Sequence, residues 1–172
     1  NTGSVEISNL VFINNSADYG GAIYLPKLSS TSYTTTVSYN NFTNNSAIMG
    51  GAIYVNAYPV TVSHNNFTNN SASRYGGAIY VDLADKADAP VMSYNNFTKN
   101  TADSGGAIYV PVSSKKVTIS YSSFDENIAT GNGTMDGLGG AIYNGAQGDV
   151  DKDISFSNFT RNVASADGGA NR

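Results

Sequence analysis

The sequence is internally periodic, and this periodicity constrains the fold more than any other feature of the chain. A Phe-x-x-Asn motif recurs six times, at intervals of 30, 25, 30, 27 and 35 residues. Its phenylalanines are Phe12, Phe42, Phe67, Phe97, Phe124 and Phe159. The first five motifs are each followed by Gly-Gly-Ala-Ile-Tyr, and the sixth is followed by a shortened Gly-Gly-Ala. This regular alternation predicts an array of equivalent structural units.

Each unit is typical of short β-strands separated by turns. Runs such as Val60–Ser63 and residues 107–110 are rich in β-branched residues, and the Asn-Asn and Gly-Gly pairs between such runs favour turns. No segment has the apolar spacing of a helix, and units of 25–35 residues are too short for four-stranded propeller blades. We therefore predict an all-β parallel β-helix of about six coils, each with three short strands.

Stacked coils would place equivalent residues directly above one another, about 4.8 Å apart. The six phenylalanines would then form an internal aromatic stack. The asparagine three residues after each Phe would form a ladder at a left-handed bend. A second interior wall would be formed by Ile23, Ile53, Ile79, Ile108 and Ile142. We expect the variable segments 29–36, 81–90 and 130–138 to be loops that leave the stack.

Composition excludes several classes of partner and site. The 172 residues include only 13% charged side chains, with nine Lys and Arg and a net charge of −4. We expect no nucleic-acid binding and no attraction to anionic membranes, because so few cations cannot neutralise a run of phosphates. No apolar run approaches the roughly 20 residues of a membrane-spanning helix. The absence of cysteine excludes disulfides and thiolate sites.

We expect residues 1–172 to form a single β-helix domain. Both ends lie close to or inside a repeat and carry no evident cap, so each would offer a template for a further coil. The domain is therefore expected to be a segment of a longer repeat protein, or a fibre subunit that self-associates end to end.

Candidate catalytic and metal-binding residues are few. Asp149, Asp151 and Asp153 alternate along one predicted strand, but the calcium-loop pattern requires glycine where Ile154 stands. A second acidic set comprises Asp82, Asp85 and Asp88. We interpret both sets as solvated charge. The only histidine, His64, falls in a mostly aromatic column that we interpret as structural, so we expect no catalytic residue, metal site or cofactor.

The tyrosines of the Gly-Gly-Ala-Ile-Tyr motif are the main candidate for ligand binding. Strand alternation points them outward if the preceding isoleucines point inward. They would then form an exposed ladder of large, rigid and partly polar side chains suited to glycans or proteins. These residues are Tyr24, Tyr54, Tyr80, Tyr109 and Tyr143.

Asn-x-Ser/Thr sequons are a second surface feature, because the repeat itself generates them. The candidate glycosylation sites are Asn14, Asn41, Asn44, Asn66, Asn69, Asn96, Asn132 and Asn158. Members of a buried asparagine ladder could not carry a glycan.

The alternation of Phe-x-x-Asn with Gly-Gly-Ala-Ile resembles the repeat of chlamydial polymorphic outer-membrane proteins. The Asn-Asn-Phe-Thr-Asn-Asn-Ser-Ala motif at residues 40–47 and 65–72 is also similar to motifs of the adhesin-like surface proteins of methanogenic archaea. The resemblance implies a right-handed parallel β-helix at the cell surface, with an adhesive role and no particular ligand. Departures are the sixth Gly-Gly-Ala, which lacks Ile, and Leu10-Val11 in place of Asn-Asn before Phe12.

We therefore predict a non-enzymatic, extracellular adhesin or stalk module that presents loops and a polar, tyrosine-bearing face to protein or glycan ligands on another cell surface. A self-assembling extracellular fibre subunit is the alternative. A polysaccharide lyase or hydrolase of the same fold is a third, and it would require a close pair of carboxylates in a groove.

Overall fold

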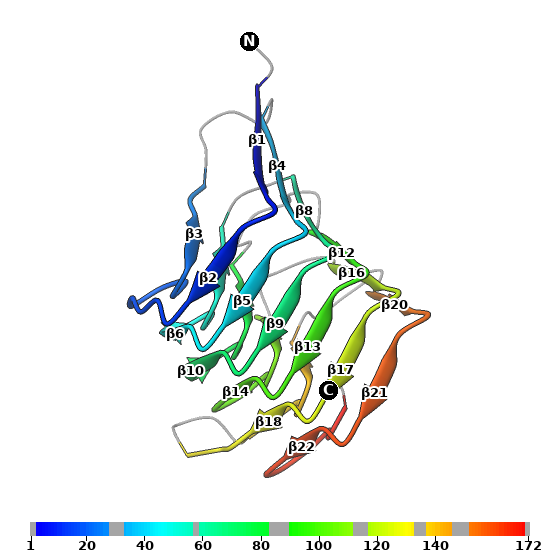
Figure 1. The fold of residues 1–172 in the computed structure, drawn as a ribbon. Helices are drawn as coiled ribbons and strands as arrows, with labels where there is room; N and C mark the ends of the chain where they lie inside the picture. The colour runs from blue at the N-terminus through cyan, green and yellow to red at the C-terminus, as the bar shows by residue number, and fades with distance from the viewer. Residues whose placement is uncertain are drawn as a thin grey trace.

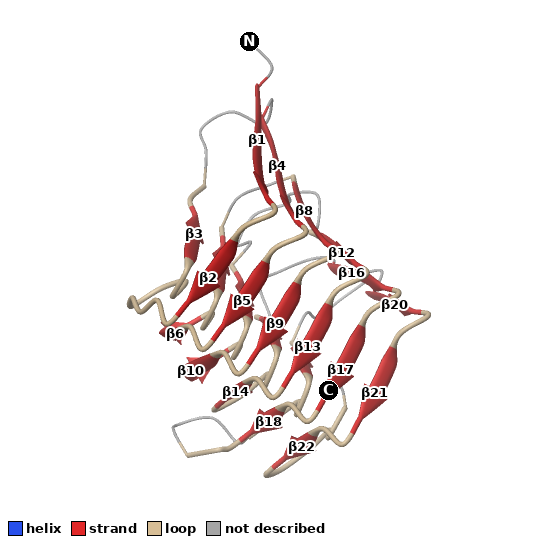
Figure 2. Ribbon diagram, in the orientation of Figure 1, coloured by secondary structure: helices blue, strands red, loops and turns tan. Residues whose placement is uncertain are grey.

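Figure 1 shows a computed structural model of the chain, in which short strands from successive coils stack side by side. The structure describes residues 3–27, 33–56, 59–82, 90–111, 117–132, 137–145 and 152–170. Every regular element in these ranges is a β-strand (Figure 2). None of the described residues forms a helix able to cross a membrane.

Two six-stranded parallel sheets receive the first two strands of each coil. We name them sheets A and B. Sheet A contains β1 (Gly3–Ser8), β4 (Tyr33–Ser38), β8 (Val60–Ser63), β12 (Val91–Ser93), β16 (Val117–Ser120) and β20 (Lys152–Ser155). Sheet B contains β2 (Val11–Ile13), β5 (Asn41–Thr43), β9 (Asn66–Thr68), β13 (Asn96–Thr98), β17 (Ser123–Asp125) and β21 (Asn158–Thr160).

Two five-stranded parallel sheets complete the coils, and we name them sheets C and D. Sheet C contains β6 (Ser46–Met49), β10 (Ser71–Tyr75), β14 (Thr101–Ala102), β18 (Ile128–Ala129) and β22 (Val163–Ala164). Sheet D contains β3 (Ile23–Leu25), β7 (Ile53–Val55), β11 (Ile79–Val81), β15 (Ile108–Val110) and β19 (Ile142–Asn144). Strands that are neighbours in a sheet come from successive coils, so the predicted parallel β-helix is confirmed.

The structure corrects two details of the prediction. Each complete coil has four strands rather than three, because the short run that ends in Ala after each Asn pairs as sheet C. This run is Ser-Ala in β6 and β10, and Thr-Ala, Ile-Ala and Val-Ala in the later coils. Two predicted loops are also shorter than expected: residues 33–36 lie in β4 and Val81 lies in β11. These residues pair in register with the neighbouring coils, which extends the sheets into the variable segments.

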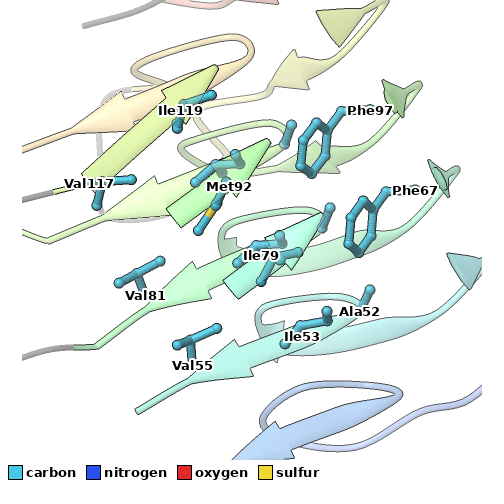
Figure 3. Packing of buried hydrophobic residues seen from close by; sticks show 14 of the residues in the cluster. Ala52, Ile53, Val55, Phe67, Ile79, Val81, Met92, Phe97, Val117 and Ile119 are labelled. Carbon is cyan, nitrogen blue, oxygen red and sulfur yellow. The ribbon is translucent and has the colours of Figure 1, made fainter. Parts of the chain in front are cut away.

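The predicted phenylalanine stack forms the interior wall of sheet B. Successive rings lie 4.7–4.8 Å apart between centroids with interplanar angles of 3–5°. The predicted isoleucine wall is also confirmed, because Ile53 and Ile79 of sheet D lie in the same buried cluster as Phe67 and Phe97 (Figure 3). Aligned stacking lets each new coil bury the apolar surface of the one before it.

Asparagine ladders close the turn between sheets B and C. Asn70 Nδ2 donates to Asn100 Oδ1 at 3.1 Å and to the carbonyl oxygen of Phe42 at 3.0 Å, and Asn45 donates to Asn70 in the same way. The predicted ladder is therefore confirmed, but the left-handed residue is the one before it. Asn69, for example, has φ 54°, whereas Asn70 is not among the positive-φ residues. The ladder asparagine supplies hydrogen bonds, and its neighbour supplies the bend.

A second ladder, which the sequence analysis missed, closes the turn between sheets A and B. Asn40 donates to Asn65, and Asn65 to Asn95, at Nδ2–Oδ1 distances of 3.0 and 3.1 Å. Ser122 and Ser157 continue it in the next two coils by accepting backbone hydrogen bonds. Both ladders satisfy buried backbone groups that the sheets leave unpaired at the turns.

The glycine pairs form the turn between sheets C and D, and the two members serve different purposes. Gly76 has φ +65°, a backbone conformation that residues other than glycine rarely adopt. A Cβ on Gly77 would instead collide with the carbonyl oxygen of Gly106 in the next coil. The close, constant spacing between coils at this corner therefore requires both glycines.

Candidate functional site

The predicted tyrosine ladder lies on the outer face of sheet D, but most of it is covered. Tyr54 and Tyr80 are in register, and their rings stack at 5.1 Å. Tyr24 is exposed and Tyr143 half-buried, whereas Tyr54, Tyr80 and Tyr109 are only 8%, 9% and 6% exposed. The outward orientation is as expected, but the prediction of an exposed ladder is wrong for these three residues.

Side chains that precede the glycine pairs contribute to this cover. Tyr75 stacks on Tyr109 at 4.5 Å, and Tyr19 packs edge-on against Tyr54 at 5.3 Å. Met49 is partly buried against the same tyrosine cluster. The sequence does contain a sign of this cover, because a large residue precedes Gly-Gly in several units. The direction in which that side chain points, however, depends on the turn between sheets C and D.

The covered hydroxyls are held in their neutral form. Tyr54 Oη donates to Asp82 Oδ2 at 2.6 Å. Burial, reinforced by this hydrogen bond and by the charge of Asp82, raises the pKa of Tyr54 well above its ordinary value. Burial likewise raises the pKa of Tyr80 to about 12, and burial followed by the influence of Tyr143 raises that of Tyr109. The cluster is a packed aromatic layer over sheet D.

A different column of rings is exposed. It lies at the corner between sheets A and B, and we name it the aromatic ridge. It consists of Tyr39, His64, Tyr94, Tyr121 and Phe156. Successive centroids lie 4.7–4.9 Å apart with interplanar angles of 2–7°. All five residues are exposed; Tyr94 and Tyr121 are each 49% exposed, and Phe156 is 76% exposed. The column of His64 is thus a surface ladder, in which His64 stacks between Tyr39 and Tyr94.

The ridge residues adopt a backbone conformation that bulky side chains usually avoid. Their φ values are 49–57°, in the left-handed region. This conformation costs an L-residue about 1–2 kcal/mol, and asparagine tolerates it best. Asn9 occupies this position in the first coil, and Asn44 and Asn69 occupy the equivalent left-handed position at the next corner. Ring stacking returns about 0.5–1.5 kcal/mol per pair, which offsets the cost without making an aromatic residue necessary.

Two further columns extend from the ridge across the outer face of sheet B. The amide column consists of Asn41, Asn66, Asn96, Ser123 and Asn158. The hydroxyl column consists of Thr43, Thr68, Thr98, Asp125 and Thr160. We name the ridge and these two columns together the ridge face. The ionisable side chains of the ridge face are its tyrosines, His64 and Asp125. Arg161 pairs with Asp125 at 2.6 Å.

The acidic candidates do not assemble into a site within the described residues. Asp82 binds Tyr54, and Asp153 is an exposed residue of β20 in register with Thr118. Asp85, Asp88, Asp149 and Asp151 lie outside the described residues. In the described part of the chain, no group of three or more His, Asp or Glu side chains is arranged to hold a metal ion.

One close pair of carboxylates does occur. Arg161 contacts Asp125 at 2.6 Å and Glu126 at 2.9 Å, and Lys99 lies 3.6 Å from Glu126. The four side chains are substantially exposed at the corner between sheets B and C. Lys99, Glu126 and Arg161 hold the left-handed position that Asn44 and Asn69 hold in earlier coils, and Asp125 belongs to the adjacent hydroxyl column. Exposed ion pairs of this kind contribute little stability. The arrangement is a charged version of the corner column, in which both carboxylates are already neutralised by cations.

All eight sequon asparagines are exposed. Asn41, Asn66, Asn96 and Asn158 belong to the amide column, whereas Asn14, Asn44 and Asn69 hold left-handed corner positions. The buried ladder asparagines are separate residues, so the two sets do not compete. Glycosylation at the sequons stays a prediction.

Comparison with known protein families places the repeats in context. The family model of the Chlamydia polymorphic membrane protein (Chlamydia_PMP) repeat matches residues 9–26, 41–56, 66–82 and 96–111. The chain therefore carries chlamydial polymorphic membrane protein-like repeats, as the sequence motifs indicated. That family consists of non-enzymatic, adhesin-like proteins of the outer membrane and cell surface. Neither the curated proteins nor the solved structures yielded a match.

Proposed function

We propose that the chain is a non-enzymatic extracellular module that adheres to protein or glycan ligands on another cell surface through its ridge face. The observation that carries the proposal is the exposed aromatic ridge with its neighbouring amide and hydroxyl columns, held in register over five coils. Exposed aromatic and amide groups on a rigid scaffold are effective binding groups, because little conformational entropy is lost when a ligand binds.

Rigidity is supplied by the interior rather than by the face itself. The phenylalanine stack and the two hydrogen-bonded ladders connect every coil to the next. The family of the matched repeats supports a cell-surface location for such a module. The covered tyrosines of sheet D contribute to this role through packing, whereas Tyr24, which is exposed on sheet D, is a separate candidate for ligand contact.

Adhesion can be measured with the purified chain immobilised on fluorescent beads. We expect saturable binding to a subset of microbial or animal cells, competed by free chain. Absence of saturable binding to every cell type tested would contradict the proposal. Release of new reducing ends from polysaccharides would contradict its non-enzymatic part.

End-to-end self-association stays a separate prediction. Light scattering across a wide concentration range tests it: growth of particles with concentration is expected for a fibre subunit, and a constant monomer mass would contradict it.

A further inference from the structure

We infer that the ridge face binds an uncharged linear polysaccharide that lies along the stacking axis. This inference rests on the proposed adhesive function and specifies its ligand class. It starts from the aromatic ridge, because neither the fold nor the core requires aromatic residues there. The turn accommodates asparagine in the first coil at Asn9, and the equivalent bend at the next corner carries Asn44, Asn69 and Lys99.

The groups that face solvent decide how such a ligand can bind. Parallel stacking covers both faces of the His64, Tyr94 and Tyr121 rings, so the ring edges and phenol hydroxyls remain available. Sugars therefore cannot stack on the faces of these inner rings. They can contact the ring edges through C–H groups and exchange hydrogen bonds with the phenols and the adjacent amides. Asn66 and Asn96 provide exposed amides two residues from the ridge.

Charge excludes the other common polymers. The ridge and the amide column contain no Lys, Arg, Asp or Glu, and the one carboxylate of the hydroxyl column is paired with Arg161. A nucleic acid or an anionic glycan would meet cations only at the edge of this face, where Lys99 and Arg161 are already paired with carboxylates. A cationic polymer would meet only those same paired carboxylates. An uncharged ligand with many hydroxyls is complementary to this face.

Periodicity indicates a polymer. An aromatic ring, an amide and a threonine hydroxyl recur in four of the five coils of the ridge face, at the ring spacing of 4.7–4.9 Å. The exception is the coil of Tyr121, which carries Ser123 and Asp125. A small ligand would contact the groups of only one or two coils, and the same groups in the other coils would make no contact with it. A linear polysaccharide presents its own repeating hydroxyls along its length, so many weak contacts combine into useful affinity.

The experiment measures retention of the full chain by a panel of polysaccharides. Cellulose, chitin, mannan, xylan and starch are the uncharged members, and heparin and polygalacturonate are the charged members. The ridge variant combines Tyr94→Asn with Tyr121→Asn, because asparagine suits the left-handed bend. The matched control is Lys99→Asn, which changes a left-handed residue with φ 56° at the other corner. We expect the parent chain to bind at least one uncharged polysaccharide, the ridge variant to bind at least tenfold more weakly, and the control to bind as the parent does.

A second variant guards against misfolding of the first. Asn96→Asp removes an amide donor but preserves the acceptor oxygen to which Ser123 Oγ donates at 2.7 Å. We expect it to weaken binding by at least threefold without changing the circular dichroism spectrum. Retention by none of the uncharged polysaccharides, retention only by charged ones, or unchanged affinity in folded variants would overturn the inference.

Cell binding by the same preparations separates this inference from the proposed function. Beads that bind cells while the uncharged panel fails would overturn the polysaccharide ligand and leave adhesion intact. Failure of both assays would overturn adhesion itself.

Discussion

Replacing Asn70 by alanine should destabilise the fold far more than replacing its neighbour Asn69 by glycine. The Asn70 side chain takes part in four hydrogen bonds: its oxygen accepts two from Asn45, and its amide donates to Phe42 and to Asn100. The lengths are 3.0–3.1 Å, and the residue is fully buried. The substitution breaks all four and removes the side-chain acceptor of the Asn45 backbone N–H.

The magnitude follows from these bonds. A buried hydrogen bond contributes a net 0.5–1.5 kcal/mol, and a buried donor left without a partner costs about 1–3 kcal/mol. Four broken bonds account for about 2–6 kcal/mol and one orphaned donor for about 1–3 kcal/mol more, so the loss in unfolding free energy is roughly 3–9 kcal/mol. The whole free energy of unfolding of a typical domain is about 5–15 kcal/mol. Asn70→Ala should accordingly lose much of the cooperative transition at room temperature.

The control is Asn69→Gly. Asn69 is exposed and has φ 54°, a conformation that glycine adopts freely, so we expect a change within about 0.5 kcal/mol. Urea unfolding followed by circular dichroism compares the two variants with the parent. A loss below about 1 kcal/mol for Asn70→Ala, or equal losses in both variants, would refute the account of the ladder.

Three further predictions address the core, the tyrosines and the sequons. Phe67→Ala should lower the free energy of unfolding by about 3–5 kcal/mol, because the buried ring is stacked on both sides. Phe156→Ala at the exposed ridge should lower it by less than about 1 kcal/mol. A loss below 1 kcal/mol for Phe67→Ala would show that this ring is not part of the core. In an ultraviolet titration, the three covered tyrosines should stay un-ionised above pH 10, with Tyr80 ionising near pH 12. Because their pKa values are raised in the folded state, their contribution to stability is fully present below pH 10 and should fall as the pH rises further. If all twelve tyrosines of the folded chain titrated together near pH 10, that result would contradict the burial of these three. Expression in a host that glycosylates sequons should add glycans that mass spectrometry detects, and occupancy at Asn66 should abolish binding by the ridge face; full binding by a chain modified there would count against the amide column.

The repeat architecture was predictable because it depends on local patterns that recur. Each phenylalanine, isoleucine and ladder asparagine needs only its equivalents in adjacent coils, so the spacing of motifs along the chain already indicates which residues stack. The second ladder at Asn40, Asn65 and Asn95 escaped notice because its column changes to serine in later coils. Sheet C escaped notice because small polar residues such as Ser46 and Ser71 lack the apolar signal of a strand.

The sequence by itself determined which residues align in columns, and therefore the fold, its core and the asparagine ladder that follows each phenylalanine. Tertiary structure alone decided which columns face solvent. Strand alternation points Tyr54 and Tyr80 outward, but the residues before the turns between sheets C and D cover them, Tyr19 packing on Tyr54 and Tyr75 on Tyr80. The left-handed bend between sheets A and B instead projects Tyr39 and Tyr94 away from the core. Exposure depends on how neighbouring turns direct their side chains, and a periodic pattern within one strand carries no information about those directions.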